Sequence, residues 1–449
     1  MLRHISILFV SILLLVTHVD LYSQKKKSSR TIPMSREFKG SFEKALSNPL
    51  HFKRLAYKNR GLDEFPEDIG RFENLEYLDL SGNKLTSLPN SIKNLKNLKI
   101  LILSSNNFTQ IPPEIAELRS LQELIIADND ITFFNLNTSK LSNLTALDIS
   151  RNKLKDLPDS FAELKQLELL AISYNSFTKF PEELLKLKNL GYLDISHNKM
   201  GDLPKEIKQI WNLNRLNISS IGIKELPESL CELSKLEWLD LSRNELTELP
   251  ENFTNLKLLE YLNLSSNPFK KFHKDFGMLE NLKTLNISNC KLKNIPPEVG
   301  DLKNLTSLSF AYNEVVRIKF KLESMTGLLN LDASNNKFKD IDPKILNLNN
   351  LIKLDLHNNQ IYQLNSRIGK LTKLKILDLG GNNIRQIPSS IGNLQQLRVL
   401  KLERNMLNFL PSTVARITTL KAIYLSGNPI SGAEKKRIKT LLPRTMIRY

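Results

Sequence analysis

Few side chains in this sequence are spaced to carry out covalent chemistry. The six histidines and two cysteines show no zinc-site spacing, no pairing of nucleophile and base, and no phosphate-binding glycine loop. The aromatic and basic residues are more regular, since Tyr192, Arg215, Trp238 and Tyr261 follow one another at intervals of 23 residues. Tyr, Trp and Arg are the types most enriched in binding hot spots. The pattern therefore favours non-covalent recognition, and no catalytic residue, cofactor or metal ligand is predicted.

The interval of 23 residues belongs to a repeat that fills most of the chain. It is marked by an asparagine at 83, 106, 129, 152, 175, 198, 244, 267, 313, 336, 359, 382, 405 and 428. Ile221 and Cys290 stand at the two interrupted places and do not shift the series, and Arg60 occupies the equivalent place in an imperfect first unit. A period this regular predicts stacked, nearly identical units that form one elongated array.

The segment from Leu75 to Leu98 shows what one unit must contain. The alternation around Leu78 predicts a short strand with one buried face, and the spacing of Ile92 and Leu95 fits one helical or 3₁₀ turn. Between them, Asn83 follows a sharp bend, where a buried amide side chain can satisfy backbone groups that lack a strand partner. Stacked units therefore predict a parallel sheet and an internal column of asparagines.

The repeated pattern LxxLxLxxN/CxLxxLPxxIxxL resembles the leucine-rich-repeat family over about residues 52–430. The LPxxI segment is similar to the subclass shared by Ras-pathway scaffold proteins and secreted bacterial leucine-rich-repeat proteins. The resemblance implies an α/β solenoid, a horseshoe or superhelix with a parallel β-sheet on the concave face and short helical or 3₁₀ turns on the convex face. It also implies protein binding through the concave face. Because the chain lacks cysteine-rich caps, the exported bacterial group is the closer match.

The remaining segments frame the array. Residues 1–23 are typical of a signal peptide, with Arg3 followed by an apolar run over 5–16 that is short for a membrane span. An uncleaved N-terminal anchor is the alternative, and no later segment could cross a membrane. We expect a basic flexible leader over 24–35, an N-terminal capping helix over 36–51, an array of about 17 units over 52–430 and a C-terminal cap over 431–449. The protein should be exported to the periplasm, the outer surface or the medium.

The partner site is predicted from the strand residues that point to the concave face, because these vary between units. An apolar group comes first along the chain and an aromatic and charged group follows in the central units, joined by two residues of a flanking column. The predicted partner-binding residues are Ile100, Ile102, Ile125, Leu169, Tyr174, Tyr192, Asp194, Arg215, Asn217, Trp238, Asp240, Arg243, Tyr261 and Asn263.

The formal charge of +17 raises the question of a nucleic-acid partner. Most lysines fall at outward positions of the units, and no basic stripe with interleaved aromatics is present, so no nucleic acid is predicted. The two cysteines lie in different units, too far apart for a disulfide; we expect Cys290 to be buried and Cys231 to be exposed.

These observations favour an exported, non-enzymatic protein-binding scaffold, which would contact a host protein if the source is a pathogen. Two alternatives remain open. The aromatic residues and basic rim also suit a glycan or an envelope polymer, and the apolar region over 100–169 also suits structural self-association.

Overall fold

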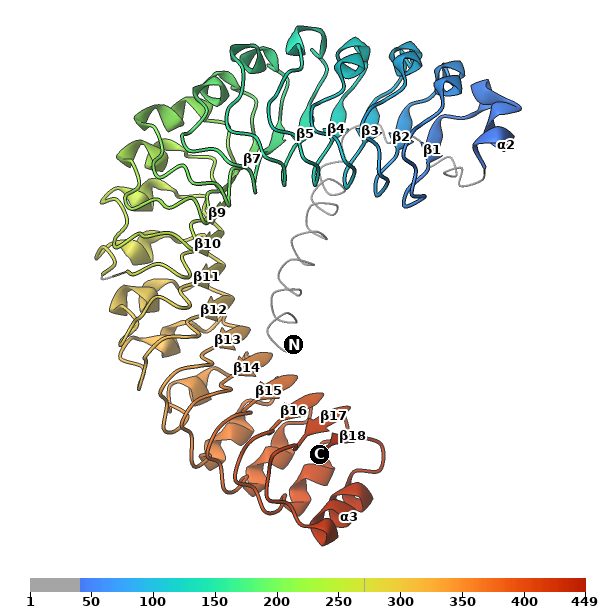
Figure 1. Cartoon of the computed structure of the whole chain (residues 1–449). Coiled ribbons are helices and arrows are strands. Elements are labelled where there is room, and N and C mark those ends of the chain that lie inside the picture. Colours follow the sequence, from blue (N-terminus) through green and yellow to red (C-terminus); the bar gives the residue numbers. More distant parts are fainter. Residues whose placement is uncertain (1–40, 270) are drawn as a thin grey trace.

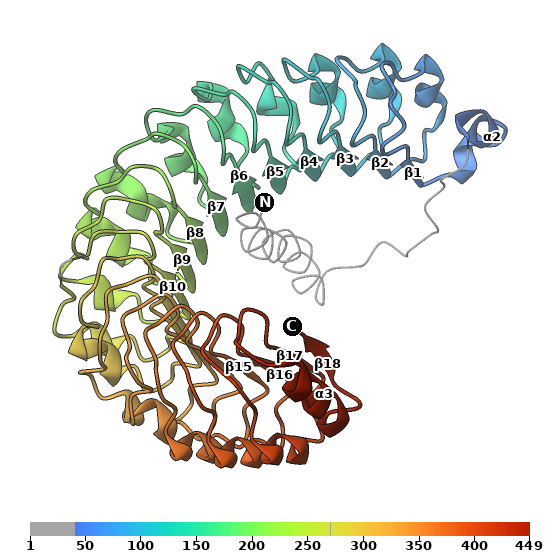
Figure 2. The ribbon, with the colours of Figure 1, turned by 60° about the horizontal axis from the view of Figure 1, so that its bottom comes forward.

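The computed structural model of this chain describes residues 41–269 and 271–449. They form an open arc with strands along its inner side and short helical turns along its outer side (Figure 1). A view from another direction shows the same two layers over the whole arc (Figure 2). This confirms the predicted solenoid. The signal peptide, the leader and the first part of the predicted cap lie outside the described residues. No described helix is long and apolar enough to cross a bilayer.

The inner layer is one parallel sheet of 18 short strands in chain order. The strands are β1 (Arg54–Ala56), β2 (Tyr77–Asp79), β3 (Ile100–Ile102), β4 (Glu123–Ile125), β5 (Ala146–Asp148), β6 (Leu169–Ala171), β7 (Tyr192–Asp194), β8 (Arg215–Asn217), β9 (Trp238–Asp240), β10 (Tyr261–Asn263), β11 (Thr284–Asn286), β12 (Ser307–Ser309), β13 (Asn330–Asp332), β14 (Lys353–Asp355), β15 (Ile376–Asp378), β16 (Val399–Lys401), β17 (Ala422–Tyr424) and β18 (Met446–Arg448).

The outer layer consists of 3₁₀ helices, one for each return segment. They are η1 (Pro49–His51), η2 (Glu67–Arg71), η3 (Asn90–Asn94), η4 (Pro113–Glu117), η5 (Thr138–Lys140), η6 (Asp159–Glu163), η7 (Glu182–Lys186), η8 (Lys205–Ile210), η9 (Glu228–Glu232), η10 (Phe253–Asn255), η11 (Phe276–Met278), η12 (Pro297–Asp301), η13 (Leu322–Ser324), η14 (Ile345–Asn347), η15 (Ser366–Lys370), η16 (Ser389–Asn393) and η17 (Ser412–Arg416). Most follow a proline such as Pro89, whose fixed φ of -64° suits the extended residue before a turn.

The register of the sheet follows the repeat. Each residue of β2 pairs with the residue 23 positions later in β3, as Leu78 does with Leu101, and the same offset continues to β17. The central residue of each repeat strand is buried, while its two neighbours face the inner side. Inner-face residues therefore form straight columns across the sheet, which makes neighbours of residues that are distant in the sequence.

The asparagine column lies inside the array, between the two layers. Asn382 shows its bonding: Nδ2 donates to the carbonyl oxygens of Leu356 and Leu379, both at 3.0 Å, and Oδ1 accepts from the Ile361 amide at 3.0 Å. The same two carbonyls also accept from the ladder residues on either side, Asn359 and Asn405. Each carbonyl thus has two amide donors, whereas the Ile361 N–H has the single ladder acceptor.

The two interruptions of the ladder are tolerated for this reason. At Cys290, the thiol takes over two of the contacts, with Sγ 3.4 Å from the carbonyl oxygens of Leu264 and Ser288. At Ile221, the side chain is fully buried and offers no polar atom, but Asn244 Oδ1 accepts from the amides of Ile221 and Gly222 at 3.1 and 3.0 Å. The two backbone carbonyls that a ladder asparagine at position 221 would contact keep one amide donor each. Only one backbone N–H therefore loses its hydrogen-bond acceptor.

Replacing Ile221 with asparagine is expected to stabilise the protein. The new Oδ1 would accept from the Met200 N–H, which corresponds to the Ile361 N–H beside Asn382, and an unpaired buried amide costs about 1–3 kcal/mol. The loss of apolar burial offsets part of this gain, so the net rise in the free energy of unfolding should be about 1 kcal/mol. Thermal unfolding followed by circular dichroism measures the change. Ile221→Ala, which removes the side chain without adding an amide, should lower the midpoint, and a lower midpoint for Ile221→Asn would contradict the explanation.

Both ends of the described array are covered. Helix α2 (Phe42–Leu46) begins at Ser41, whose hydroxyl accepts from the Lys44 amide, and Phe42 packs its ring 5.3 Å from that of Phe65. At the other end, helix α3 (Gly432–Leu441) begins at Ser431 and is followed by β18, which pairs with β17. These elements keep the leucines of the terminal units out of water.

Candidate functional site

The centre of the inner face carries a row of four large side chains, one on each of four adjacent strands. We call Tyr192, Arg215, Trp238 and Tyr261 the belt. They stand in register on β7, β8, β9 and β10, and all four are partly exposed. The rings of Trp238 and Tyr261 are stacked, with centroids 4.9 Å apart and planes 7° from parallel. Strands β7 to β10 lie about halfway along the inner side of the arc (Figure 1).

The belt combines three aromatic side chains with one charged side chain. Burial raises the pKa of Tyr192 well above its ordinary value, and the carboxylates of Asp194 and Asp148 act in the same direction. Burial also raises the pKa of Tyr261, with a smaller contribution from Asp240. Both phenols are therefore neutral near pH 7. Arg215 provides the belt's only positive charge, so the surface combines aromatic area with one guanidinium donor.

The predicted polar contacts beside the belt are not free to meet a partner. Asp194, Asn217 and Asn263 are each less than a tenth exposed. Their side chains bond to the protein itself: Asp194 Oδ1 accepts from the Ser196 amide at 2.9 Å, and Asn217 Oδ1 accepts from the Ser219 hydroxyl at 2.8 Å. These residues support the belt, because they fix the loops that leave the strands.

Asp240 belongs to the same supporting network but is less covered. Its Oδ2 accepts from Asn263 Nδ2 at 2.9 Å, and its Oδ1 accepts from the Ser242 amide at 2.8 Å. Burial raises the pKa of Asp240, while these hydrogen bonds oppose the rise. Its partial exposure leaves it as the one predicted acidic contact within reach of a partner.

The predicted apolar region is smaller than the sequence suggested. Ile100, Ile102 and Ile125 lie together and partly exposed on β3 and β4. Leu169 is separated from them, because Glu123 interrupts their column and Ala146 beside it is buried. The three isoleucines form one patch, and Leu169 borders the belt at Tyr192 instead.

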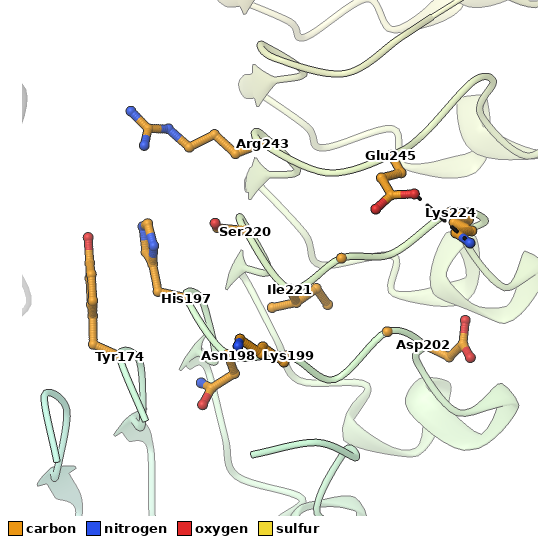
Figure 3. A pocket seen from close by; sticks show the side chains of 12 residues that line it. Tyr174, His197, Asn198, Lys199, Asp202, Ser220, Ile221, Lys224, Arg243 and Glu245 are labelled. Carbon is orange, nitrogen blue, oxygen red and sulfur yellow. Dashed lines mark ion pairs between the residues drawn. The ribbon is translucent and has the colours of Figure 1, made fainter. Parts of the chain in front are cut away.

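Two predicted residues of the flanking column, Tyr174 and Arg243, line a hollow of about 790 Å³ beside the belt. Figure 3 shows the Tyr174 and His197 rings side by side, with Arg243 extending from a separate bend toward the side on which these rings lie. The two rings are stacked with centroids 3.9 Å apart, and the Arg151 guanidinium lies 4.3 Å from the Tyr174 ring centroid. Burial, Arg243 and Arg151 all lower the pKa of His197, so it is neutral near pH 7.

The hollow exists because two glycines replace side chains that other units have. Gly201 and Gly222 have φ of 76° and 82°, and a Cβ built at either would meet no atom within 4 Å. Ile221 lies at the base, and the Lys224–Glu245 ion pair closes one side at 4.0 Å (Figure 3). The interruption of the asparagine ladder at Ile221 therefore lies at the base of the hollow.

The prediction that Cys231 is exposed was wrong. It lies in η9, is 2% exposed, and burial raises the pKa of its thiol to about 12. Its place in the repeat is held by small residues in most other units, such as Gly300 and Gly392, where a Cβ would press on the next unit. That column of small residues is the signal that could have predicted the burial. Cys290 is buried as expected, and neither cysteine is paired.

Sequence reasoning missed two features of the inner face. Arg151, which stacks on Tyr174, was not selected, although it precedes Tyr174 by one repeat. Asp332, Asp355 and Asp378 were not selected either, although they stand on three adjacent strands close to His357. The spacing of 23 residues between successive aspartates could have shown this.

Comparison with known protein families agrees with the repeat architecture described above. Residues 36–138, 181–264 and 341–441 match a model of the leucine-rich repeat region, and residues 119–200 and 280–322 match further leucine-rich-repeat models. A search of curated proteins gave no match.

Solved structures support the same assignment. A leucine-rich-repeat protein of Leptospira interrogans is 32% identical, with a TM-score of 0.73, over 92% of this chain and 100% of that one. The ectodomain of an Arabidopsis receptor kinase, solved with a peptide hormone ligand, is 28% identical with a TM-score of 0.58, over 85% of this chain and 68% of that one. An internalin of Listeria monocytogenes, at 24% identity and a TM-score of 0.56, shares the fold over 74% of this chain and 88% of that one. This chain belongs to the leucine-rich-repeat family.

Proposed function

We propose that this protein is an exported, non-enzymatic scaffold that binds another protein through the concave face of its array. The observation that carries the proposal is the belt, in which Tyr192, Arg215, Trp238 and Tyr261 occupy four adjacent strands and remain partly exposed. Aromatic and arginine side chains at the centre of a surface are typical of binding hot spots. A host protein is the proposed partner if the source is a pathogen.

Rigid support explains why such a surface could bind tightly. The buried network under the belt, with Asp194, Asn217 and Asn263, fixes the strand ends before any partner arrives. A pre-formed surface loses little conformational entropy on binding. The receptor ectodomain named above, which was solved with a peptide ligand, is consistent with recognition of a polypeptide by this fold.

Export rests on the amino-terminal pattern of Arg3 and the apolar run over 5–16. The similarity to a Leptospira interrogans protein of the same family is consistent with a bacterial source for this chain. Detection of the processed chain in the periplasm, on the outer surface or in the medium would test this part of the proposal. Its recovery only from the cytosol would overturn it.

Affinity capture with the full array, followed by mass spectrometry, is the experiment that tests protein binding. The bound fraction should be measured between 50 and about 500 mM salt, a range over which exposed charge interactions are strongly screened. A protein held mainly by the belt should remain bound, because apolar and stacking contacts depend little on salt. Recovery of an anionic polymer that dissociates as salt rises would favour the envelope-polymer alternative. Concentration-dependent size of the isolated chain would favour self-association.

A further inference from the structure

The last third of the inner face holds an unusual concentration of negative charge. Asp332, Asp355 and Asp378 are cross-strand neighbours on β13, β14 and β15. Like charges placed directly opposite each other on adjacent strands are destabilising. The other aspartates of this column are each flanked by uncharged residues, as Asp194 is by Ala171 and Asn217. Three successive carboxylates therefore need a positive partner that the rest of the sheet does not need.

A histidine completes the group. His357 follows Asp355 by two residues, and its Nδ1 lies 2.6 Å from Asp355 Oδ1. One ligand atom from each of Asp355, His357 and Asp378 lies within 4.8 Å of the other two. The carboxylates are 9% and 5% exposed, while His357 is partly exposed toward the inner face. The other ring nitrogen lies 3.0 Å from Asn335 Nδ2, which holds the ring in place.

A fourth carboxylate leans over the same group. The side chain of Glu403 lies across Gly380, where a Cβ would come within 3.0 Å of Glu403 Cδ. Glu403 Oε2 is buried and has no hydrogen-bond partner among the described residues. Asp378 and His357 are both near enough to influence its ionisation. The absence of a side chain at residue 380 thus leaves room for the Glu403 carboxylate at a position two residues after Asp378.

The nearby lysines do not balance this charge. Lys401 Nζ lies 2.9 Å from Asp378 Oδ2, but its side chain is 38% exposed and can turn toward solvent. Lys353 is exposed at the edge of the cluster. Four carboxylates face two ammonium groups here, although the chain as a whole carries a formal charge of +17.

We propose that Asp355, His357, Asp378 and Glu403 form a binding site for a divalent transition-metal ion such as Zn²⁺. One imidazole nitrogen and several carboxylate oxygens suit such an ion, whereas Mg²⁺ and Ca²⁺ are held by oxygen ligands alone. The ligand atoms of Asp355, His357 and Asp378 lie within 4.8 Å of one another and need only small movements to reach metal bonds of about 2.0–2.2 Å. Glu403 would add a further carboxylate oxygen from the neighbouring strand end. Lys401 acts as the internal counter-ion that the metal replaces.

Isothermal titration of the full chain with Zn²⁺ tests the site. We expect one saturable site that is lost or weakened at least about tenfold in His357→Ala and in Asp378→Asn. His197→Ala provides the matched control, because His197 also lies at the inner edge of the array but stacks on Tyr174 and has no carboxylate cluster. It should leave the His357-dependent binding unchanged. An excess of Mg²⁺ or Ca²⁺ should not displace the Zn²⁺.

A substitution at Lys401 should strengthen Zn²⁺ binding instead of weakening it. Lys401→Gln removes the competing ammonium and should tighten Zn²⁺ binding several-fold, a gain that a general loss of structure cannot produce. Circular dichroism and the unfolding midpoint establish that each variant is folded. Zinc binding that persists unchanged in both His357→Ala and Asp378→Asn, or no binding even in Lys401→Gln, would overturn the proposal.

Discussion

Replacing Asn382 with alanine is expected to lower the free energy of unfolding by about 2–3 kcal/mol. The substitution removes the oxygen that accepts from the Ile361 amide at 3.0 Å, in a position where Asn382 is only 5% exposed. Water cannot replace that acceptor without opening the array. The carbonyls of Leu356 and Leu379 retain Asn359 and Asn405 as donors, so the cost falls mainly on one orphaned N–H.

The neighbouring residue gives the control. Asn383 is an exposed asparagine in the same bend, and Asn383→Ala keeps the residue type and the surroundings while leaving the ladder intact. Its effect should stay within about 0.5 kcal/mol. Urea unfolding of the three proteins compares the midpoints and slopes. Equal midpoints for the two variants would mean that the ladder contributes nothing specific to stability.

The second large effect concerns binding. Changing Tyr192, Trp238 and Tyr261 together to alanine should weaken the binding of a captured protein partner at least about 100-fold. Hot-spot residues of these types contribute about 2 kcal/mol or more each, and each 1.4 kcal/mol is a factor of ten, so a hundredfold loss is a conservative sum for coupled neighbours. Surface plasmon resonance with the purified partner measures the dissociation constant.

A matched triple variant tests whether the loss of affinity depends on the belt or on any three alanine substitutions in this column. Thr284, Ser307 and Asn330 occupy the same inner-face column on β11, β12 and β13, and replacing them with alanine should change the affinity little. Trp238→Ala alone is a milder test, because that ring stacks on Tyr261 and removing it leaves the buried network of Asp240 and Asn263 in place. Unchanged affinity in a folded triple belt variant would refute the placement of the site.

Much of the candidate site could be predicted from the sequence. The belt residues recur at intervals of one repeat, and the register of the sheet places residues at that interval on adjacent strands. The repeat alone therefore predicts that Tyr192, Arg215, Trp238 and Tyr261 are neighbours. The hollow beside the belt was not predicted. It depends on the absence of side chains at Gly201 and Gly222 and on the stacking of Tyr174 with His197, which are properties of packing between units.

The sequence by itself determined the repeat, its strand and turn, the asparagine column and the side of the sheet on which each residue lies. These features depend only on the position of a residue within a unit of 23, and that position is a local property. The tertiary structure decided which inner-face groups are available. It turned Asp194, Asn217 and Asn263 into buried supports. It also brought Glu403 over Gly380 to the aspartate row. Exposure depends on the size and hydrogen bonds of side chains one repeat away, and that information exists only when the units are stacked.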